Sequence, residues 1–257
     1  MSDTGMVLEP GEKKKHYVQR MFNSIAHRYD FLNHFLSLGI DIVWRKKAIR
    51  KLDVSPDQRV LDLACGTADF ALEIIRQKQC HVVGADIALR MLQFARQKTA
   101  DSKLRLMNAD GEALPFKDDS FAGTTIAFGI RNMGNRIQAL KEMYRVLQPN
   151  GQTVILEFSL PAFAPFRRIY LFYFKNILPM VGRMVSKDKE AYSYLPASVE
   201  RFPTIEEFEN ELTLAGFKDL KHWRLLNGVA VIYKGKKLMT NDKRQKKKDL
   251  IQRLKNG

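Results

Sequence analysis

Short apolar runs alternate with segments whose apolar residues recur at helical spacing, from Val60 onward. The apolar runs predict five strands. They span Arg59–Ala64, His81–Asp86, Leu104–Ala109, Gly123–Phe128 and Thr153–Phe158. The segments between them predict helices at Ala68–Gln77, Leu89–Lys98 and Arg136–Val146. This alternation is typical of a parallel sheet covered by helices on both faces.

The end of the third predicted helix carries a stop signal. Gln148–Gly151 contains Pro149, which cannot continue a helix, and Gly151, which tolerates a positive φ. We therefore expect a turn there before the fifth strand.

Two strand-like runs, Lys218–Leu226 and Gly228–Lys236, end the pattern with about one residue between them. A connection that short cannot hold a crossover helix, so the two strands should be antiparallel. The predicted fold class is therefore α/β. We expect a doubly wound, mostly parallel, seven-stranded and Rossmann-like sheet, closed by an antiparallel C-terminal hairpin.

The pattern also divides the chain into regions. Residues 1–58 should form helices that pack on the site, and residues 59–236 should form the domain that contains the sheet. Within that domain, an aromatic-rich insertion at 160–203 precedes a predicted helix at Ile205–Ala215. Residues 237–257 form a basic tail.

The turn after the first strand predicts a nucleotide-like ligand that carries no phosphate. Asp86 ends the second strand, 20 residues beyond Gly66, as in folds that hold a ribose at a sheet edge. No further glycine completes a dinucleotide fingerprint, and no Gly-Lys-Ser/Thr of a phosphate-binding loop follows. Asp62 and Asp69 flank the turn and would repel a pyrophosphate, but they suit an ammonium group.

Carboxylates at the next strand ends complete this prediction. Asp86 can accept hydrogen bonds from both ribose hydroxyls, and Asp110 lies where a base edge would be. The ligand implied is S-adenosylmethionine. Its predicted binding residues are Asp62, Gly66, Thr67, Asp69, Asp86, Ile87, Asp110 and Gly111. Two structural alternatives remain: Asp62 could bind turn amides, and Asp86 could cap the following helix.

The turn at 60–70, Asp86, the 108–116 segment and the closing hairpin resemble class I S-adenosylmethionine-dependent methyltransferases. Four further blocks resemble one family, the C-methyltransferases of ubiquinone and menaquinone biosynthesis. These blocks are Phe22–Asn33 with Ser37, Gly39, Trp44 and Arg45; Phe128–Asn132; Leu156–Phe158; and Tyr192–Pro196 with Ser198, Phe202 and Pro203. The resemblance covers about residues 15–236. Ala68 and Ala88 depart from it, standing where Gly and Ser are usual, so we expect an ordinary φ at Ala68 and one lost cap or hydroxyl contact at Ala88.

The resemblance implies methyl transfer to a ring carbon of a reduced, prenylated quinone, which requires alignment and stabilisation of a developing phenolate. Arg131 and Asn132 are the first candidates for that role, although Arg131 could instead pair with an acid. Tyr29 and Tyr192 are further catalytic candidates. His27 and Asp30 are second choices for closing the site or moving a proton. The aromatic side chains of the 160–203 insertion suit an isoprenoid chain, or a packed core.

Cysteine and histidine usage indicates the redox compartment and the absence of a metal site. Two cysteines, Cys65 and Cys80, give no disulfide framework, and the five histidines show no metal-ligand spacing, so we expect a reducing cytoplasmic setting and no metal. No secretory signal is visible, and the most apolar window, 169–185, is interrupted by charges and Pro179.

Charge gathers at the C-terminal end. The chain carries +15 net, and residues 234–257 hold ten Lys or Arg and two Asp. This end is either a solvated tail or a segment attracted to an anionic surface, and with a quinol substrate we expect peripheral contact with the inner face of the cell membrane.

The sequence leaves open whether the protein forms a homo-oligomer. A nucleic-acid methyltransferase is the first rival hypothesis, but an Asn/Asp-Pro-Pro-aromatic block is absent after the fourth strand, so no nucleic-acid partner is expected. A non-catalytic module that binds S-adenosylmethionine is the second.

Overall fold

The computed structural model describes residues 9–28, 37, 39–99, 101–161, 163–173, 176 and 189–239, with only the backbone at residues 28 and 189–193. The helices are α2 (Glu12–Ile25), η1 (Ala26–Arg28), α4 (Ile40–Ile49), α5 (Asp69–Lys78), α6 (Leu89–Lys98), η2 (Ile130–Asn132), α7 (Arg136–Val146), α8 (Ala164–Phe172), α10 (Lys189–Glu200), α11 (Ile205–Leu214) and η4 (Leu226–Gly228). The strands are β1 (Arg59–Leu63), β2 (His81–Asp86), β3 (Leu104–Asn108), β4 (Phe121–Ala127), β5 (Leu147–Phe158), β6 (Lys218–Leu225) and β7 (Ala230–Lys236).

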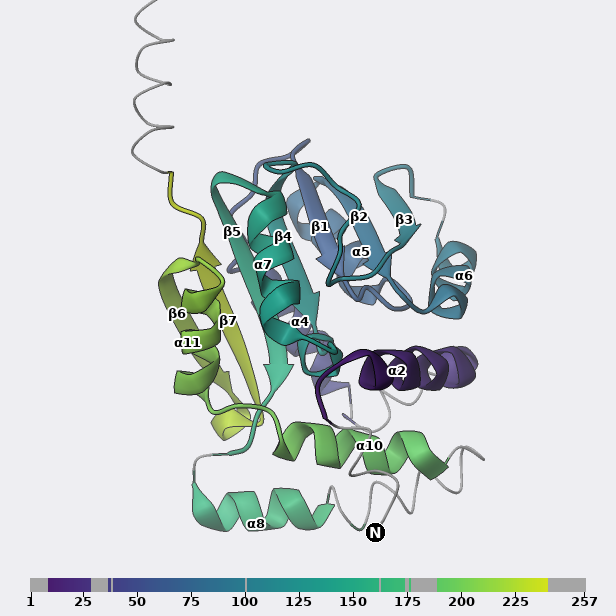
Figure 1. Cartoon of the computed structure of the whole chain (residues 1–257), viewed down its shortest axis with the longest axis vertical. Coiled ribbons are helices and arrows are strands. Elements are labelled where there is room, and N and C mark those ends of the chain that lie inside the picture. The colour runs from purple at the N-terminus through teal and green to yellow at the C-terminus, as the bar shows by residue number, and fades with distance from the viewer. Residues whose placement is uncertain are drawn as a thin grey trace, which may run out of the picture.

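The strands form one seven-stranded sheet in the order β3-β2-β1-β4-β5-β7-β6. Strands β1 to β5 pair in parallel, and β7 is antiparallel to both β5 and β6. Helices α4, α5 and α6 cover one face, and α7 and α11 cover the other (Figure 1). The carboxyl ends of the parallel strands meet at one edge, where α2, α8 and α10 also lie (Figure 1). The predicted fold class and the closing hairpin are confirmed.

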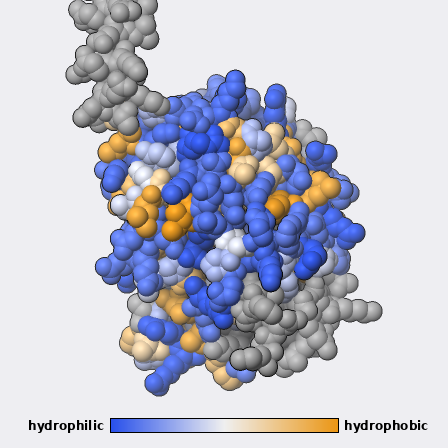
Figure 2. Space-filling view, in the orientation of Figure 1, coloured by the Kyte–Doolittle hydropathy of each residue, from blue (hydrophilic) through white to orange (hydrophobic). Residues whose placement is uncertain are grey.

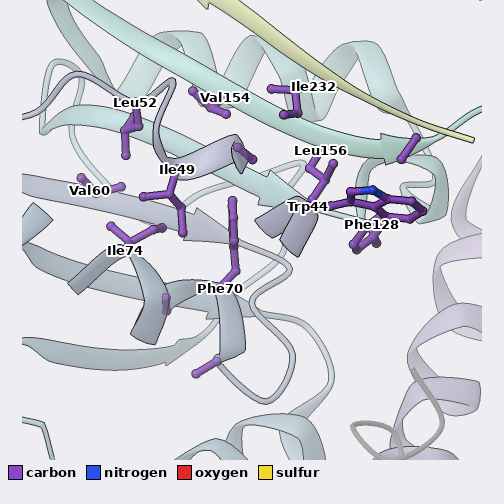
Figure 3. Packing of buried hydrophobic residues seen from close by; sticks show 14 of the residues in the cluster. Trp44, Ile49, Leu52, Val60, Phe70, Ile74, Phe128, Val154, Leu156 and Ile232 are labelled. Atoms are coloured by element: carbon purple, nitrogen blue, oxygen red, sulfur yellow. The ribbon is translucent and has the colours of Figure 1, made fainter. Parts of the chain in front are cut away.

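The core is split by the sheet into two clusters, as the alternation of side chains along a strand requires. On β1, Val60 joins the cluster under α4 and α5, whereas Leu61 and Leu63 join the cluster under α7 and α11. Figure 3 shows the first cluster, with Ile49 and Phe70 packed over the sheet. By the same alternation Asp62 faces the α5 side. The strand therefore carries a carboxylate at its penultimate position, where its pattern would place an apolar side chain.

The predicted turn at 148–151 is wrong in two respects. Strand β5 begins at Leu147, directly after α7, so the segment is a distorted start of the strand rather than a free turn. The pairing register of β4 with β5 shifts at this point. The residue with positive φ is Asn150, at 66°, and not Gly151. Gly151 is required for space instead, because a Cβ there would lie 2.8 Å from the carbonyl oxygen of Gln148.

Both segments outside the sheet are helical where the structure describes them. Residues 12–49 contain α2, η1 and α4, and the 160–203 insertion contains α8 and α10. Tyr170 of α8 and Tyr194 of α10 are buried, so these helices pack on the domain. None of the helices that the structure describes has the length and apolarity needed to cross a bilayer.

Candidate active site

A cleft of about 690 Å³, partly open to solvent, lies at the carboxyl ends of the central strands. Its walls come from the ends of β1, β2 and β4, from the loops that follow β2 and β3, from residues 128–134 and from α2. Six of the predicted site residues line it: Gly66, Asp86, Ile87, Asp110, Gly111 and Asn132. The topology therefore brings together side chains spread over nearly 70 positions of the sequence, as expected for the edge of a doubly wound sheet.

Asp86 organises the glycine turn. Its Oδ2 accepts a hydrogen bond from the Gly66 amide at 2.8 Å, and its Oδ1 accepts one from the Ala88 amide at 2.7 Å. Burial raises the pKa of Asp86 above its ordinary value. The helix-capping alternative is wrong, because α6 begins at Leu89 and the bond to Ala88 is a turn contact two residues on, before the helix. Each oxygen has a second lone pair, so Asp86 can still accept from a ligand hydroxyl in the cleft.

The turn adopts backbone angles that correct one expectation. Gly66 has a φ of 56°, but Ala68 also lies in the left-handed region, with a φ of 70°. The expectation of an ordinary φ at Ala68 is therefore wrong. The chain must leave β1 and enter α5 within a few residues, and Ala68 is the residue immediately before that helix. An alanine here carries the steric cost that a glycine would avoid.

A smaller pocket opens on the other side of the glycine turn. It is lined by Arg45, Asp62, Thr67 and Asp69, and it shares Gly66 with the main cleft. Three predicted binding residues, Asp62, Thr67 and Asp69, lie here and not in the main cleft. A ligand with two chemically different ends could therefore occupy both spaces around the turn.

Asp62 is the most perturbed acid of this pocket. Its Oδ1 accepts a hydrogen bond from Thr125 Oγ1 at 2.8 Å, whereas its Oδ2 is buried and receives none from the described residues. Burial raises the pKa of Asp62 to about 7, against the opposing effects of Thr125 and Arg45. An incompletely satisfied buried carboxylate is a suitable partner for a cationic group.

Asp69 has a different neighbour. It begins α5 and forms an ion pair with Lys98 at the end of α6. The structure thus places this carboxylate at the rim of the smaller pocket, already neutralised by a lysine.

Helix α2 forms part of the cleft and is fixed by two lysines. Lys15 Nζ lies 2.9 Å from Asp110 Oδ2, and Lys15 also lines the cleft. Lys14 Nζ donates to the carbonyl oxygens of Arg131 at 2.8 Å and of Met133 at 2.9 Å. Burial lowers the pKa of Lys14 to about 8. The base-edge carboxylate and the loop after β4 are therefore both attached to α2.

Two amide side chains of α2, Gln19 and Asn23, add hydrogen bonds to the segment around the start of α6. Asn23 Oδ1 accepts from the Arg90 amide at 3.0 Å, in the first turn of α6, and Gln19 Nε2 donates to the Ile87 carbonyl at 3.0 Å. Ala88 precedes α6 and provides no side-chain cap. The contact expected to be lost at Ala88 is thus supplied by Asn23 from another helix.

Arg131 does not line the cleft. Its Nη1 donates to Glu157 Oε1 at 2.6 Å and to the Phe128 carbonyl at 2.5 Å, and its Nε lies 3.4 Å from Ser198 Oγ. Both members of the ion pair are buried, Glu157 completely. The pairing alternative considered for Arg131 is therefore what the structure shows. Arg131 joins β4, β5 and α10 behind the cleft wall.

Asn132, by contrast, faces the cleft. Its Oδ1 accepts from Tyr194 Oη at 3.2 Å, and its Nδ2 lies 3.4 Å from the Phe128 carbonyl. The Phe128 carbonyl can only accept, so it fixes Nδ2 as the donor end of the amide, and the Tyr194 hydroxyl then donates to Oδ1. One Nδ2 hydrogen remains for a group in the cleft.

The remaining catalytic candidates are not placed. Tyr29 and Asp30 lie outside the described residues, and the side chain of Tyr192 is likewise not described. His27 is exposed in η1. Among the described residues, Tyr194, two positions from Tyr192, reaches the site through its hydrogen bond to Asn132.

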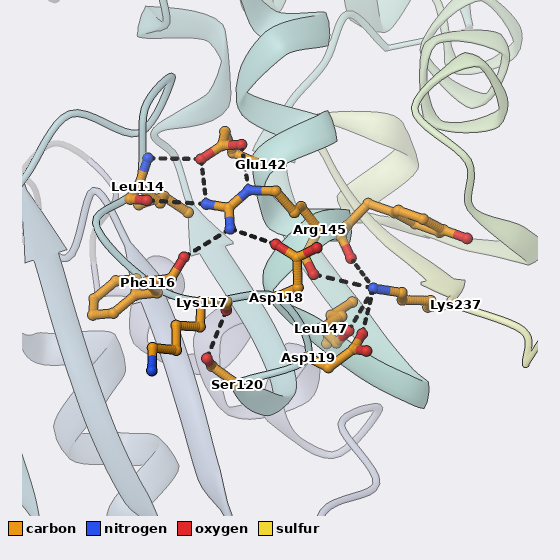
Figure 4. A network of polar contacts seen from close by, with 11 residues as sticks. Leu114, Phe116, Lys117, Asp118, Asp119, Ser120, Glu142, Arg145, Leu147 and Lys237 are labelled. Carbon is orange, nitrogen blue, oxygen red and sulfur yellow. Dashed lines mark hydrogen bonds and ion pairs between the residues drawn. The ribbon is translucent and has the colours of Figure 1, made fainter. Parts of the chain in front are cut away.

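The cleft wall formed by Asp110 and Gly111 is held by a polar network farther along the same loop (Figure 4). Arg145 of α7 donates to the carbonyl oxygens of Phe116 at 2.7 Å and Leu114 at 3.0 Å. Glu142 accepts from the Leu114 amide at 2.7 Å. The loop after β3 is therefore anchored to α7 and cannot easily move away from the cleft.

Glu157, Lys15 and Tyr194 were not predicted beside the cofactor residues; Tyr194 was expected only as one of the aromatic residues of the 160–203 insertion, and Lys15 only as a basic residue facing the membrane. Glu157 and Tyr194 do lie inside the quoted family blocks, and that position was the available signal. Lys15 belongs to a run of three lysines that resembles any solvated surface segment.

Comparison with known proteins agrees with this geometry. The profile of the ubiE/COQ5 methyltransferase family matches residues 11–237. The chain is 46% identical over 235 residues to the ubiquinone/menaquinone biosynthesis C-methyltransferase UbiE of Geotalea daltonii, covering 89% of this chain and 98% of that protein. It is 42% identical over 232 residues to the demethylmenaquinone methyltransferase of Porphyromonas gingivalis, covering 87% and 94%.

A solved structure shows the same fold at low sequence identity. The S-adenosylmethionine-dependent methyltransferase of Thermotoga maritima superposes with a TM-score of 0.62 at 20% identity, covering 86% of this chain and 99% of that one. Sheet order, closing hairpin, cleft and family profile agree. The chain therefore belongs to the ubiE/COQ5 methyltransferase family.

Proposed function

We propose that the protein transfers a methyl group from S-adenosylmethionine to a ring carbon of a prenylated quinol, with demethylmenaquinol or the corresponding ubiquinone precursor as the acceptor. The observation that carries the proposal is the pair of pockets that share Gly66 in their walls, in a chain whose relatives are named as methyltransferases of ubiquinone or menaquinone biosynthesis. When bound, S-adenosylmethionine supplies an electrophilic sulfonium methyl group.

The residues around the turn fit that cofactor. Asp86 would accept from the ribose hydroxyls, and Asp110 would lie at the adenine edge. Asp62, whose buried Oδ2 receives no hydrogen bond from the part of the chain that the structure describes, would take the ammonium, and Arg45 in the same pocket would face the carboxylate. This division uses both pockets and places no phosphate beside the acids.

Asn132 is the residue we assign to the acceptor. The ring carbon becomes nucleophilic as its neighbouring hydroxyl loses a proton, and negative charge grows on that oxygen. The free Nδ2 hydrogen of Asn132 would donate to it. The Phe128 carbonyl fixes Nδ2 as the donor end of the amide, and Tyr194 holds the side chain by donating to Oδ1. Arg131 contributes by holding the loop that carries Asn132, through Glu157 and the Phe128 carbonyl.

A prenylated quinol resides in a bilayer, so we also propose that the protein works at a membrane surface, with its basic end favouring anionic lipid. No nucleic acid is needed by this proposal.

The test is incubation with methyl-labelled S-adenosylmethionine and a panel of demethylated quinols, followed by mass analysis of the lipid product. We expect label on the quinone ring. Asn132→Leu should lower kcat by about a hundredfold while cofactor Kd stays unchanged, and Tyr194→Phe should lower kcat by less. Label in none of the quinols, or in added RNA instead, would overturn the proposal.

A further inference from the structure

Helix α8 presents apolar side chains to solvent. Ile169 and Phe172 are 67% and 61% exposed, and Phe163, just before the helix, is 60% exposed. Pro165, Ile169 and Phe172 are spaced four and three residues apart, so they follow one face of the helix. Large apolar side chains gathered on one helix mark an interaction surface, whereas isolated ones do not.

The opposite face of α8 shows that the helix is anchored rather than loose. Tyr170 is buried and Phe166 packs on the core cluster that also contains Phe128. Arg131 and Glu157 both act on the hydroxyl of Tyr170 electrostatically. The exposed stripe is therefore held at a fixed angle, one layer of side chains away from the loop that carries the site.

The charge on the same helix identifies the partner. Arg167 and Arg168 are exposed, and α8 contains no acidic residue. Arg168 lies one turn before Phe172, so a guanidinium borders the apolar stripe. Apolar side chains bordered by arginines match the boundary between acyl chains and anionic headgroups, where the stripe enters the apolar layer and the cations remain with the phosphates.

The position of α8 supports this partner. The helix lies at the edge of the sheet where the parallel strands end, beside α10 (Figure 1). Figure 2 shows apolar and polar surface intermixed at this end of the molecule. A bilayer seated against this end would lie nearest the edge where the cleft opens.

We infer that α8 is the membrane-docking element of the protein, with Ile169 and Phe172 inserted into an anionic bilayer and Arg168 bound to its headgroup phosphates. The reason for docking rests on the proposed function, in which the substrate is a membrane lipid. Membrane binding itself can be measured without any substrate.

The experiment measures partitioning of the full-length chain onto vesicles of phosphatidylcholine and phosphatidylglycerol at about 3:1, in low salt and in about 0.5 M salt, which screens the basic tail. Ile169→Gln is compared with Leu214→Gln, a matched control on α11 that is 68% exposed. In high salt, Ile169→Gln should lose about fivefold to tenfold in partition coefficient, Ile169→Gln/Phe172→Gln should lose about thirtyfold or more, and Leu214→Gln should not change. In low salt, Arg168→Gln should lose about fivefold.

Equal partitioning of the Ile169 variants and the Leu214 control would overturn the inference. So would a wild-type dimer that becomes monomeric in Ile169→Gln/Phe172→Gln without losing vesicle binding, because the face would then serve self-association. Turnover separates this inference from the proposed function. The variants should methylate a short-chain quinol in detergent at the wild-type rate and lose activity only on vesicle-embedded quinol. A wild type that methylates neither quinol refutes the function, while the partitioning result still decides the docking.

Discussion

Replacing Arg131 with methionine should destabilise the protein far more than an ordinary substitution, because Glu157 would be left buried without its cation. Three losses contribute. The charged hydrogen bond to Glu157 Oε1 contributes about 1.5–3 kcal/mol, and the Phe128 carbonyl loses its closest donor at about 1–2 kcal/mol. The guanidinium also lies 5.3 Å from the Phe158 ring centroid, a contact of about 0.5–1 kcal/mol. These terms agree with the general cost of about 3–5 kcal/mol for breaking a buried pair.

The assay is urea unfolding followed by tryptophan fluorescence, which the two tryptophans of the chain permit. Arg131→Met/Glu157→Gln should regain about 2 kcal/mol over Arg131→Met, because the remaining buried group is then neutral. A loss below about 1 kcal/mol, or a double variant no more stable than the single one, would refute the reasoning. Methyl-transfer rates decide the role of the residue. Activity that returns with stability in the double variant indicates a positioning role, and activity that stays lost indicates direct stabilisation of the acceptor oxygen.

The remaining predictions concern the turn, the cap and the buried acid. Ala68→Gly should change the free energy of unfolding by less than about 0.5 kcal/mol, because relief of the left-handed strain offsets the lost buried methyl; a loss above about 2 kcal/mol in urea unfolding would contradict the strain argument. Asn23→Ala should lower the free energy of unfolding by about 1 kcal/mol in the same measurement, whereas Asn23→Asp, which keeps an acceptor oxygen, should lower it little. Equal losses in the two variants would show that the hydrogen bond to the Arg90 amide contributes nothing. For Asp62, the folded protein keeps a proton up to about pH 7 that the unfolded chain releases near 3.8, so stability of the ligand-free protein should fall by about 4 kcal/mol as pH rises between these values. Asp62→Asn should remove this slope, and cofactor affinity by calorimetry should rise toward pH 7 in the wild type only; an unchanged slope in Asp62→Asn excludes Asp62 as its source.

The regular elements were predictable because their patterns are local. Strand β2 and helices α6 and α7 match the predicted boundaries, since an apolar period and a stop signal both lie within each segment. The closing hairpin followed from the length of its connection alone. Backbone detail was less accessible: Ala68 takes a positive φ for which its residue type gave no signal, and the positive φ expected near Gly151 falls on Asn150 instead. There the requirement to join neighbouring elements outweighs local preference.

The placement of several residues at the candidate cleft was predictable for a similar reason. Strand-end residues such as Asp86 and Asp110 reach the cleft by topology, so their positions follow from the strand order. The orientation of a side chain does not. Arg131 is directed toward Glu157, which lies 26 residues later on β5. This pairing depends on how the strands pack, so it could not be predicted from the local sequence.

The attachment of α2 has a kinetic consequence. Lys14, Lys15 and Asn23 hold this helix to the loop after β4, the loop after β3 and the first turn of α6. Lys15, Val18 and Phe22 also form part of the cleft. A molecule that fills the cleft contacts the helix, so binding should reduce the rate at which α2 opens locally. Amide hydrogen exchange in residues 12–25 should then slow when the cleft is filled.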